Sequence, residues 1–92
     1  MKAADWIDRV KAARGWDSDY KAAKELGISR NTISTYRGRP MTTLEEDTAI
    51  SVANALGERP EAVLLDQYAE RTKNPAVRSA LKEAASKLCI LC

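Results

Sequence analysis

The sequence predicts an all-α protein of five or six helices, and three observations support this prediction. Apolar residues recur at helical spacing, as at Ala22 and Leu26 or at Val77 and Leu81. Glycine stands where several of these segments end, and serine or asparagine stands just before others begin. A length of 92 residues with 45% hydrophobic content suits one small globular domain.

The first expected helix covers residues 3–14. Trp6 and Val10 are spaced to lie on one stripe of it, and Gly15 ends it. An aromatic side chain at position 6 could bind a partner, but the stripe favours a place in the core. We expect Trp16, in the linker that follows, to pack over the second helix.

Residues 19–38 contain two short helical patterns joined by a tight turn. Gly27 suits a C-cap with positive φ, while Ser18 and Ser29 suit the N-caps of the two helices. The second of these helices is expected over residues 30–37, before a Gly-Arg-Pro segment that ends it. Two helices joined by a short glycine-containing turn form a helix-turn-helix. The apolar, inward candidates are Tyr20, Ala22, Ala23, Leu26, Ile33 and Tyr36.

The other side of the second of these helices is polar and has no acidic residue, since none occurs from Gly27 to Pro40. Arginine can bind guanine through two hydrogen bonds, asparagine can bind adenine in the same way, and serine or threonine can contact a base or a phosphate. The pattern therefore favours DNA reading over the alternative of a helical hairpin that contacts no nucleic acid. The residues of this side are Arg30, Asn31, Thr32, Ser34, Thr35 and Arg37.

The turn resembles the helix-turn-helix of the lambda repressor and Cro-like (XRE-type) family, in the frame A-x-x-x-G-[IV]-S-x-x-x-[IV]-S. The resemblance extends over about residues 4–68 and implies a domain that binds duplex DNA. It implies base contacts from Arg30, Asn31, Ser34 and Thr35, with Ser29 at the start of the helix. It implies phosphate contacts from Thr32, Arg37, Arg39 and Lys21. Many members have a neutral polar residue where Asp19 stands here; Asp19 would repel a phosphate, so Ser18 could take that contact instead.

A fourth helix is expected to start near Leu44, with Thr43 and Glu46 as a capping box, and to end at Gly57. The carboxylates of residues 45–47 could be a metal or acid–base site, but consecutive carboxylates point in different directions around a helix. Interaction with the helix dipole is the better interpretation. The buried stripe is expected to comprise Leu44, Ala49, Val52, Ala53 and Leu56.

The segment ALGERPEAVLL, residues 55–65, resembles the same family, in which a short fifth helix follows the fourth. Pro60 suits the first turn of this helix. Its apolar side is expected to comprise Val63, Leu64, Gln67 and Tyr68. We therefore assign residues 1–70 to a helix-turn-helix domain.

Residues 71–92 add a sixth helix, which Asn74 and Pro75 begin, and an apolar tail. The amphipathic helix either completes the core or forms a dimer seam, and the spacing does not favour one of these alternatives. The tail from Cys89 to Cys92 matches a prenylation signal and half a zinc site, but simple packing of an apolar end is the preferred interpretation.

Composition excludes several functional classes. The chain has no histidine, which excludes Ser-His and Cys-His catalysis, and no enzyme, cofactor or metal site is expected. No signal peptide or membrane span is expected either, so we predict a cytoplasmic protein with reduced thiols. Residues 1–40 carry nine Lys/Arg against five Asp/Glu, and residues 41–92 carry six against eight, which suits one phosphate-facing side.

The polar outer side of the helix and the family resemblance together predict a sequence-specific transcriptional regulator of duplex DNA. The sequence also resembles small phage-related proteins that carry this domain, which implies a phage-type repressor. A homodimer is expected because one helix reads only a few base pairs, whereas a two-fold pair reads a palindrome. The alternative is a phage-derived module that binds a host protein instead of DNA.

Overall fold

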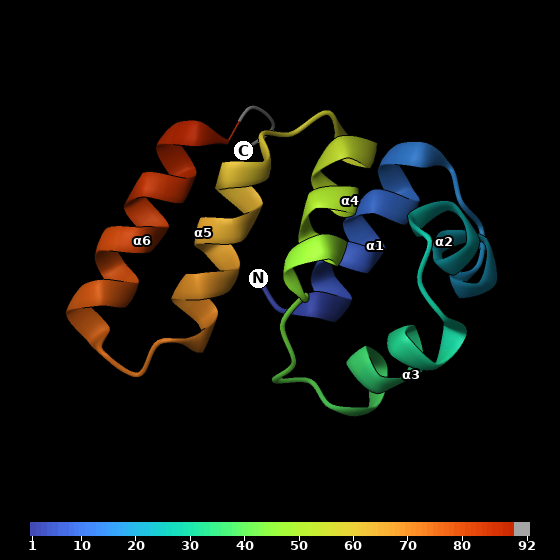
Figure 1. Cartoon of the computed structure of the whole chain (residues 1–92), viewed down its shortest axis with the longest axis horizontal. Helices are drawn as coiled ribbons and strands as arrows, with labels where there is room; N and C mark the ends of the chain where they lie inside the picture. The colour runs from blue at the N-terminus through green and yellow to red at the C-terminus, as the bar shows by residue number, and fades with distance from the viewer. Residues whose placement is uncertain (90–92) are drawn as a thin grey trace.

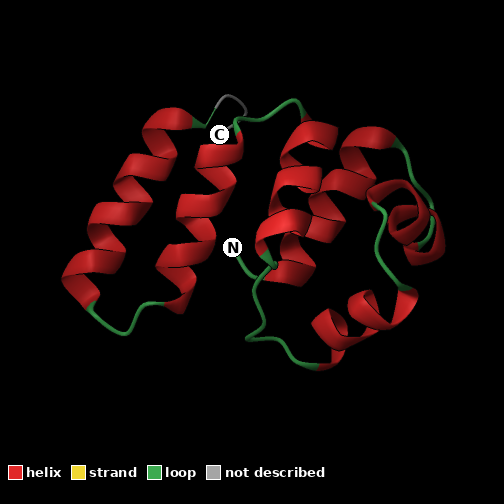
Figure 2. Cartoon of the chain, in the orientation of Figure 1, coloured by secondary structure: helices red, strands yellow, loops and turns green. Residues whose placement is uncertain are grey.

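The computed structural model describes residues 1–89 and contains six helices joined by short loops (Figure 2). No strand occurs in this part of the chain. The all-α prediction is therefore confirmed. The helices are α1 (Ala3–Arg14), α2 (Asp19–Leu26), α3 (Arg30–Gly38), α4 (Glu46–Leu56), α5 (Pro60–Arg71) and α6 (Pro75–Leu88).

The helices form an elongated molecule with extents of 37 × 26 × 18 Å. Helices α1 and α4 pack on each other in the middle, and α2 and α3 lie at one end (Figure 1). Helices α5 and α6 form an antiparallel hairpin at the other end, with α5 against α4. The helix-turn-helix and the C-terminal hairpin are therefore separate surfaces, so a ligand can occupy one without touching the other.

One apolar cluster contains residues from each of the five helices α1, α2, α3, α4 and α5. It includes most of the residues that the sequence analysis predicted to be buried. Trp6 is 3% exposed and Ile7 is fully buried, so the prediction that Trp6 belongs to the core is confirmed. Trp16 is half-buried and packs against the same cluster. The cluster comprises Ala3, Trp6, Ile7, Val10, Ala22, Ala23, Leu26, Ile33, Tyr36, Leu44, Ala49, Val52, Ala53, Leu56 and Val63.

The turn between α2 and α3 has the local chemistry expected from the sequence. Gly27 adopts the left-handed conformation with φ of 71°, which a residue with a Cβ atom adopts at a cost. The Ser18 hydroxyl accepts a hydrogen bond from the amide of Lys21, and the Ser29 hydroxyl accepts one from the amide of Thr32. These caps satisfy amides that would otherwise lack partners at the two helix starts.

The start of α4 differs from the prediction. The helix begins at Glu46, and Thr43 forms no capping box. The Thr43 hydroxyl instead accepts a hydrogen bond from Nε of Arg71, 2.8 Å away, and the amide of Leu44 donates to Gln67. Residues 43–44 thus lie outside α4, and partners on α5 satisfy their polar groups. A short-range sequence pattern does not reveal partners that are more than 20 positions away.

Helix α5 also corrects one prediction, because Tyr68 is 57% exposed and does not belong to its buried side. Gln67 does belong to it and is 1% exposed. Its side-chain oxygen accepts from the Leu44 amide at 2.7 Å, and its nitrogen donates to the Met1 carbonyl at 2.7 Å and to Asp66 at 2.9 Å. The side chain of Gln67 therefore connects α5 by hydrogen bonds to Met1 and to the segment that precedes α4.

Helix α6 packs on α5 and on no other helix, and it adds no residue to the core cluster of the described chain. Ala85 is its only buried residue, while Leu81, Ala84 and Leu88 are half-buried. The contacts of α6 are therefore with α5 alone, and both alternatives, completion of the core and a dimer seam, stay predictions. The assignment of residues 71–92 to a separate unit stays a prediction as well.

The predictions for the C-terminal tail fall largely on residues 90–92, which lie outside the described residues. Cys89, the last described residue, is disulfide-bonded. The expectation of a reduced thiol is therefore wrong for Cys89.

The N-terminal segment is held to α5 by ion pairs. The Met1 ammonium lies 3.0 Å from Asp66 and 2.8 Å from Glu70, and Nζ of Lys2 lies 2.7 Å from the other oxygen of Glu70. Hydrogen bonds from Lys2 and from the N-terminal ammonium lower the pKa of Glu70 to about 2. The carboxylate therefore stabilises the folded state while it is charged, through ion pairs with Met1, Lys2 and, at 3.6 Å, Lys82.

Replacing Glu70 by glutamine is expected to lower the free energy of unfolding by about 1–2 kcal/mol at pH 7, a value that allows for screening by water. The contribution of Glu70 is complete above its ordinary pKa of 4.5 and is lost as the pH falls through about 2. Urea unfolding of both proteins at pH 7 and near pH 2 measures the difference, which should disappear at the lower pH. An equal difference at both pH values would contradict the electrostatic origin.

Candidate nucleic-acid interface

The position of α3 is determined by two buried side chains on its inner side. Ile33 is 1% exposed and Tyr36 is 2% exposed, and both belong to the core cluster. The Tyr36 hydroxyl donates a hydrogen bond to the Glu45 carboxylate at the start of α4. Burial, together with this carboxylate, raises the pKa of Tyr36 far above its usual range, so the phenol stays protonated. These contacts turn the opposite side of α3 toward solvent.

The outer side of α3 carries polar and basic groups. Thr35 donates its hydroxyl to the Asn31 carbonyl, 3.0 Å away, which still leaves the hydroxyl oxygen able to accept. The side chains of Asn31, Ser34 and Arg39 form no hydrogen bond or ion pair with residues 1–89. These groups are therefore available to a ligand. We define the α3 face as the exposed residues Arg30, Asn31, Ser34, Thr35 and Arg39.

Ser29 and Thr32 lie at the edge of the α3 face and are partly engaged within the chain. Their hydroxyl oxygens are 2.9 Å apart, and the Ser29 hydroxyl also caps the helix. Thr32 is half-buried. Both are close to the first turn of α3, where amides without partners favour an anion.

Arg37, which the sequence placed among the phosphate contacts, is held by two carboxylates. Its Nη2 atom lies 2.8 Å from Asp8 of α1 and 2.8 Å from Asp19 of α2, and its Nε atom lies 3.1 Å from Asp19. Asp19, and then Asp8, raise the pKa of Arg37 above its usual range. Arg37 thus ties α3 to both preceding helices, and this use competes with a phosphate contact.

Asp19, which departs from the family pattern, is neutralised by the same network. In addition to Arg37, it accepts a hydrogen bond from Nζ of Lys11 at 2.9 Å. The Arg37 guanidinium, with Lys11, holds the pKa of the Asp19 carboxyl well below its usual range. The carboxylate is charged but faces two cations, so the repulsion of a phosphate at the start of α2 is smaller than the sequence suggests.

Lys21, another predicted phosphate contact, lies on the exposed side of α2. Its Nζ atom is 3.1 Å from Glu25 in an i,i+4 pair, and both side chains are more than 40% exposed. Such a pair is weak and exchanges readily with another anion. Ser18, in contrast, is half-buried and uses its hydroxyl to cap α2.

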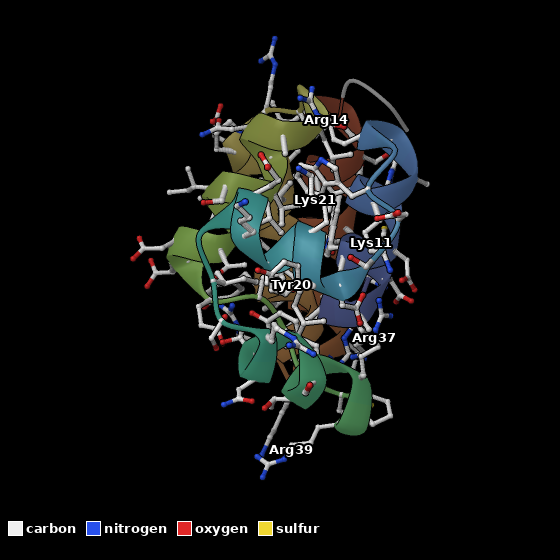
Figure 3. The ribbon with its side chains drawn as sticks, turned by 90° about the vertical axis from the view of Figure 1, so that its right-hand side faces the viewer. Lys11, Arg14, Tyr20, Lys21, Arg37 and Arg39 are labelled. Carbon is white, nitrogen blue, oxygen red and sulfur yellow. The ribbon has the colours of Figure 1, made fainter. Side chains whose placement is uncertain are left out.

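Tyr20 was expected on the inner side of α2, but it is 59% exposed. Arg30 of α3 lies over its ring, with the guanidinium carbon 5.5 Å from the ring centroid. Figure 3 shows Tyr20 near the middle of this side of the molecule, with Arg39 extending beyond the far end of α3. Helical spacing alone did not predict that Tyr20 is exposed. In a helix of only eight residues, an apolar residue can lie on the outer side without disturbing the apolar pattern of the inner side. The other basic side chains labelled in Figure 3 are Lys11, Arg14, Lys21 and Arg37.

Metal-binding clusters and membrane-spanning helices are both absent from the described part of the chain. Residues 1–89 contain no group of three or more His, Cys, Asp or Glu residues that could hold a metal ion. Within the same residues, no helix is both long enough and apolar enough to cross a membrane.

Comparison with known proteins gives one informative relative. The Mu-like prophage FluMu DNA-binding protein Ner of Haemophilus influenzae is 35% identical to this chain over 75 residues, which are 82% of this chain and 78% of the relative. No family model matches the chain, and no solved structure matches it. Identity at this level over most of both chains indicates common descent with a shared fold. The chain belongs to the family of the Mu-like prophage DNA-binding protein Ner.

Proposed function

We propose that this protein is a sequence-specific transcriptional regulator that binds duplex DNA, of the phage repressor type. The observation that carries the proposal is the α3 face, where exposed polar and basic groups lie on a helix that contains no acidic residue and that Ile33 and Tyr36 anchor in the core. The name of the Haemophilus influenzae relative supports the same ligand. An enzymatic step forms no part of the proposal.

In the proposed complex, α3 enters the major groove. Arg30 and Asn31, in its first turn, would contact base edges, and so would Ser34 and Thr35 one turn later. Arg39 and Lys21 would contact phosphates on either side of the groove, together with Thr32 and Ser29 near the start of α3. Each contact comes from a residue whose side chain is exposed or at the edge of the α3 face.

We further propose that two copies bind one palindromic site. A single helix in the major groove reads only a few base pairs, and a two-fold pair doubles the contacts with DNA. The half-buried stripe of α6 already packs on α5, so the surface that joins the copies would lie elsewhere on α6 or on another element.

Selection of bound duplexes from random DNA, at low and at moderate salt, tests the function. A palindromic consensus that persists at moderate salt supports a dimeric regulator. A consensus without symmetry supports DNA reading by one copy. Weak binding without a consensus would reject sequence-specific binding, because sequence-independent contacts with phosphates weaken steeply with salt. A host protein would then be the partner to seek.

Arg37 and Arg39 are expected to behave differently although both were predicted to contact phosphates. Arg39→Met should leave stability unchanged and lower the slope of log affinity against log salt by about 0.9, the loss of one phosphate contact. Arg37→Met should lower the free energy of unfolding by about 1 kcal/mol, because Asp8 and Asp19 lose their shared cation in a largely exposed network. Thermal melts and salt titrations measure the two quantities. Unchanged stability of Arg37→Met with a reduced salt slope would make Arg37 a phosphate contact after all.

A further inference from the structure

Tyr20 and Arg30 belong to different helices, but they form one exposed pair across the turn. The guanidinium carbon of Arg30 lies 5.5 Å from the centroid of the Tyr20 ring, within the range of a cation–π interaction. Tyr20 is 59% exposed, and its hydroxyl forms no hydrogen bond with residues 1–89. Both residues of the pair are exposed, so a ligand can reach them.

The ring restricts the arginine that the proposed function places at a base edge. A free arginine side chain samples many rotamers and loses that freedom when it binds. A guanidinium that already lies on an aromatic face loses less, and its edge remains free to donate two parallel hydrogen bonds. Guanine presents the two matching acceptors, O6 and N7, in the major groove.

We infer that Tyr20 is a specificity-determining residue, which holds Arg30 in position to read one guanine and contacts an adjacent phosphate through its hydroxyl. This inference rests on the proposed function. It adds an aromatic residue to the first turn of α2, where the proposed function already includes Lys21. The neighbouring Asp19 does not oppose it, because Lys11 and Arg37 compensate the charge of that carboxylate.

The two parts of Tyr20 have separate roles and can be removed one at a time. Tyr20→Phe retains the ring and loses the hydroxyl, so we expect about two- to tenfold weaker binding to every duplex with unchanged base preference. Tyr20→Leu removes the aromatic ring that contacts Arg30. We therefore expect the preference for guanine at one base pair to fall about two- to fivefold, which is the effect of losing one exposed cation–π interaction. Tyr68→Leu is the matched control, because Tyr68 is 57% exposed on α5.

The experiment measures affinity for the selected duplex and for its three variants at each base pair of a half-site. Wild type, the three tyrosine variants, Arg30→Ala and the double variant Tyr20→Leu/Arg30→Ala are compared, after circular dichroism has shown that each is folded. We expect Tyr20→Leu to weaken the base preference at the same base pair as Arg30→Ala does. In a protein that already carries Arg30→Ala, Tyr20→Leu should weaken that preference no further. Tyr68→Leu should match the wild type.

Three results would overturn the inference. Tyr20→Leu could retain the wild-type base preference while Arg30→Ala loses it, which would mean that the ring does not position Arg30. Tyr20→Leu could relax the preference equally with and without Arg30, which would mean that Tyr20 acts independently of Arg30. A wild-type protein that selects no consensus would overturn the proposed function together with this inference, so the two failures are distinguishable.

Discussion

Replacing Arg30 by alanine is expected to weaken binding to the selected DNA site by about 1–3 kcal/mol, which is roughly 5- to 150-fold. Arg30 opens α3 and is exposed, and Tyr20 limits the positions that its guanidinium can adopt. Loss of two hydrogen bonds to guanine should reduce affinity for the preferred site much more than affinity for other duplexes. The base pair that Arg30 contacts should then accept other bases almost equally.

Arg59→Ala is the matched control for this prediction. Arg59 is exposed at the N-cap of α5, outside the helix-turn-helix, and its replacement removes the same charge. Both variants should lose a little non-specific affinity, because both carry one positive charge fewer. Fluorescence anisotropy with the selected duplex and with a scrambled duplex measures both effects. Equal losses on the two duplexes for Arg30→Ala would assign Arg30 to phosphate contact instead of base reading.

Replacing Gln67 by leucine is expected to lower the free energy of unfolding by about 2–4 kcal/mol and the melting temperature by about 10–25 °C. Leucine has a similar size but cannot accept from the buried amide of Leu44 or donate to the Met1 carbonyl. The amide would then be buried without a partner, which costs more than the hydrogen bond itself is worth. The free energy follows from urea unfolding at neutral pH.

Tyr68→Leu tests whether the effect of Gln67→Leu comes from these hydrogen bonds. Residue 68 follows directly on the same helix, but its side chain is exposed, so this replacement should change stability by less than about 0.5 kcal/mol. Similar losses in the free energy of unfolding for both variants would attribute the effect to the presence of leucine in α5 and not to the loss of the Gln67 hydrogen bonds. Gln67 is remote from the α3 face, so DNA affinity per folded molecule should not change at temperatures where the variant is folded.

Interactions between residues close in the sequence were predictable. The caps at Ser18 and Ser29 and the left-handed Gly27 involve contacts within about four positions, so the local sequence contains the chemistry that determines them. The periodicity of apolar residues likewise indicated the six helices and nearly all of the core, because a helix places every third or fourth residue on one side. The exposed residues of α3 follow from the same geometry.

Interactions between residues far apart in the sequence depended on the tertiary structure. Thr43 has capping chemistry but bonds Arg71, and Arg37 has phosphate-binding chemistry but lies between Asp8 and Asp19. A side chain that could bond several partners bonds those that the packing of the helices brings close to it. The spacing of residues in the sequence does not predict which partners these are.

The sequence by itself therefore determined the helical fold, the caps at Ser18, Ser29 and Asn74 and the polar outer side of α3, because each depends on contacts within one or two turns of chain. The tertiary structure decided which of those polar groups are free. It turned Tyr20 outward beside Arg30, enclosed Arg37 between two carboxylates and left Asn31, Ser34 and Arg39 without partners among residues 1–89. The physical reason is that availability for binding depends on distances between helices, which only the packing of the core establishes.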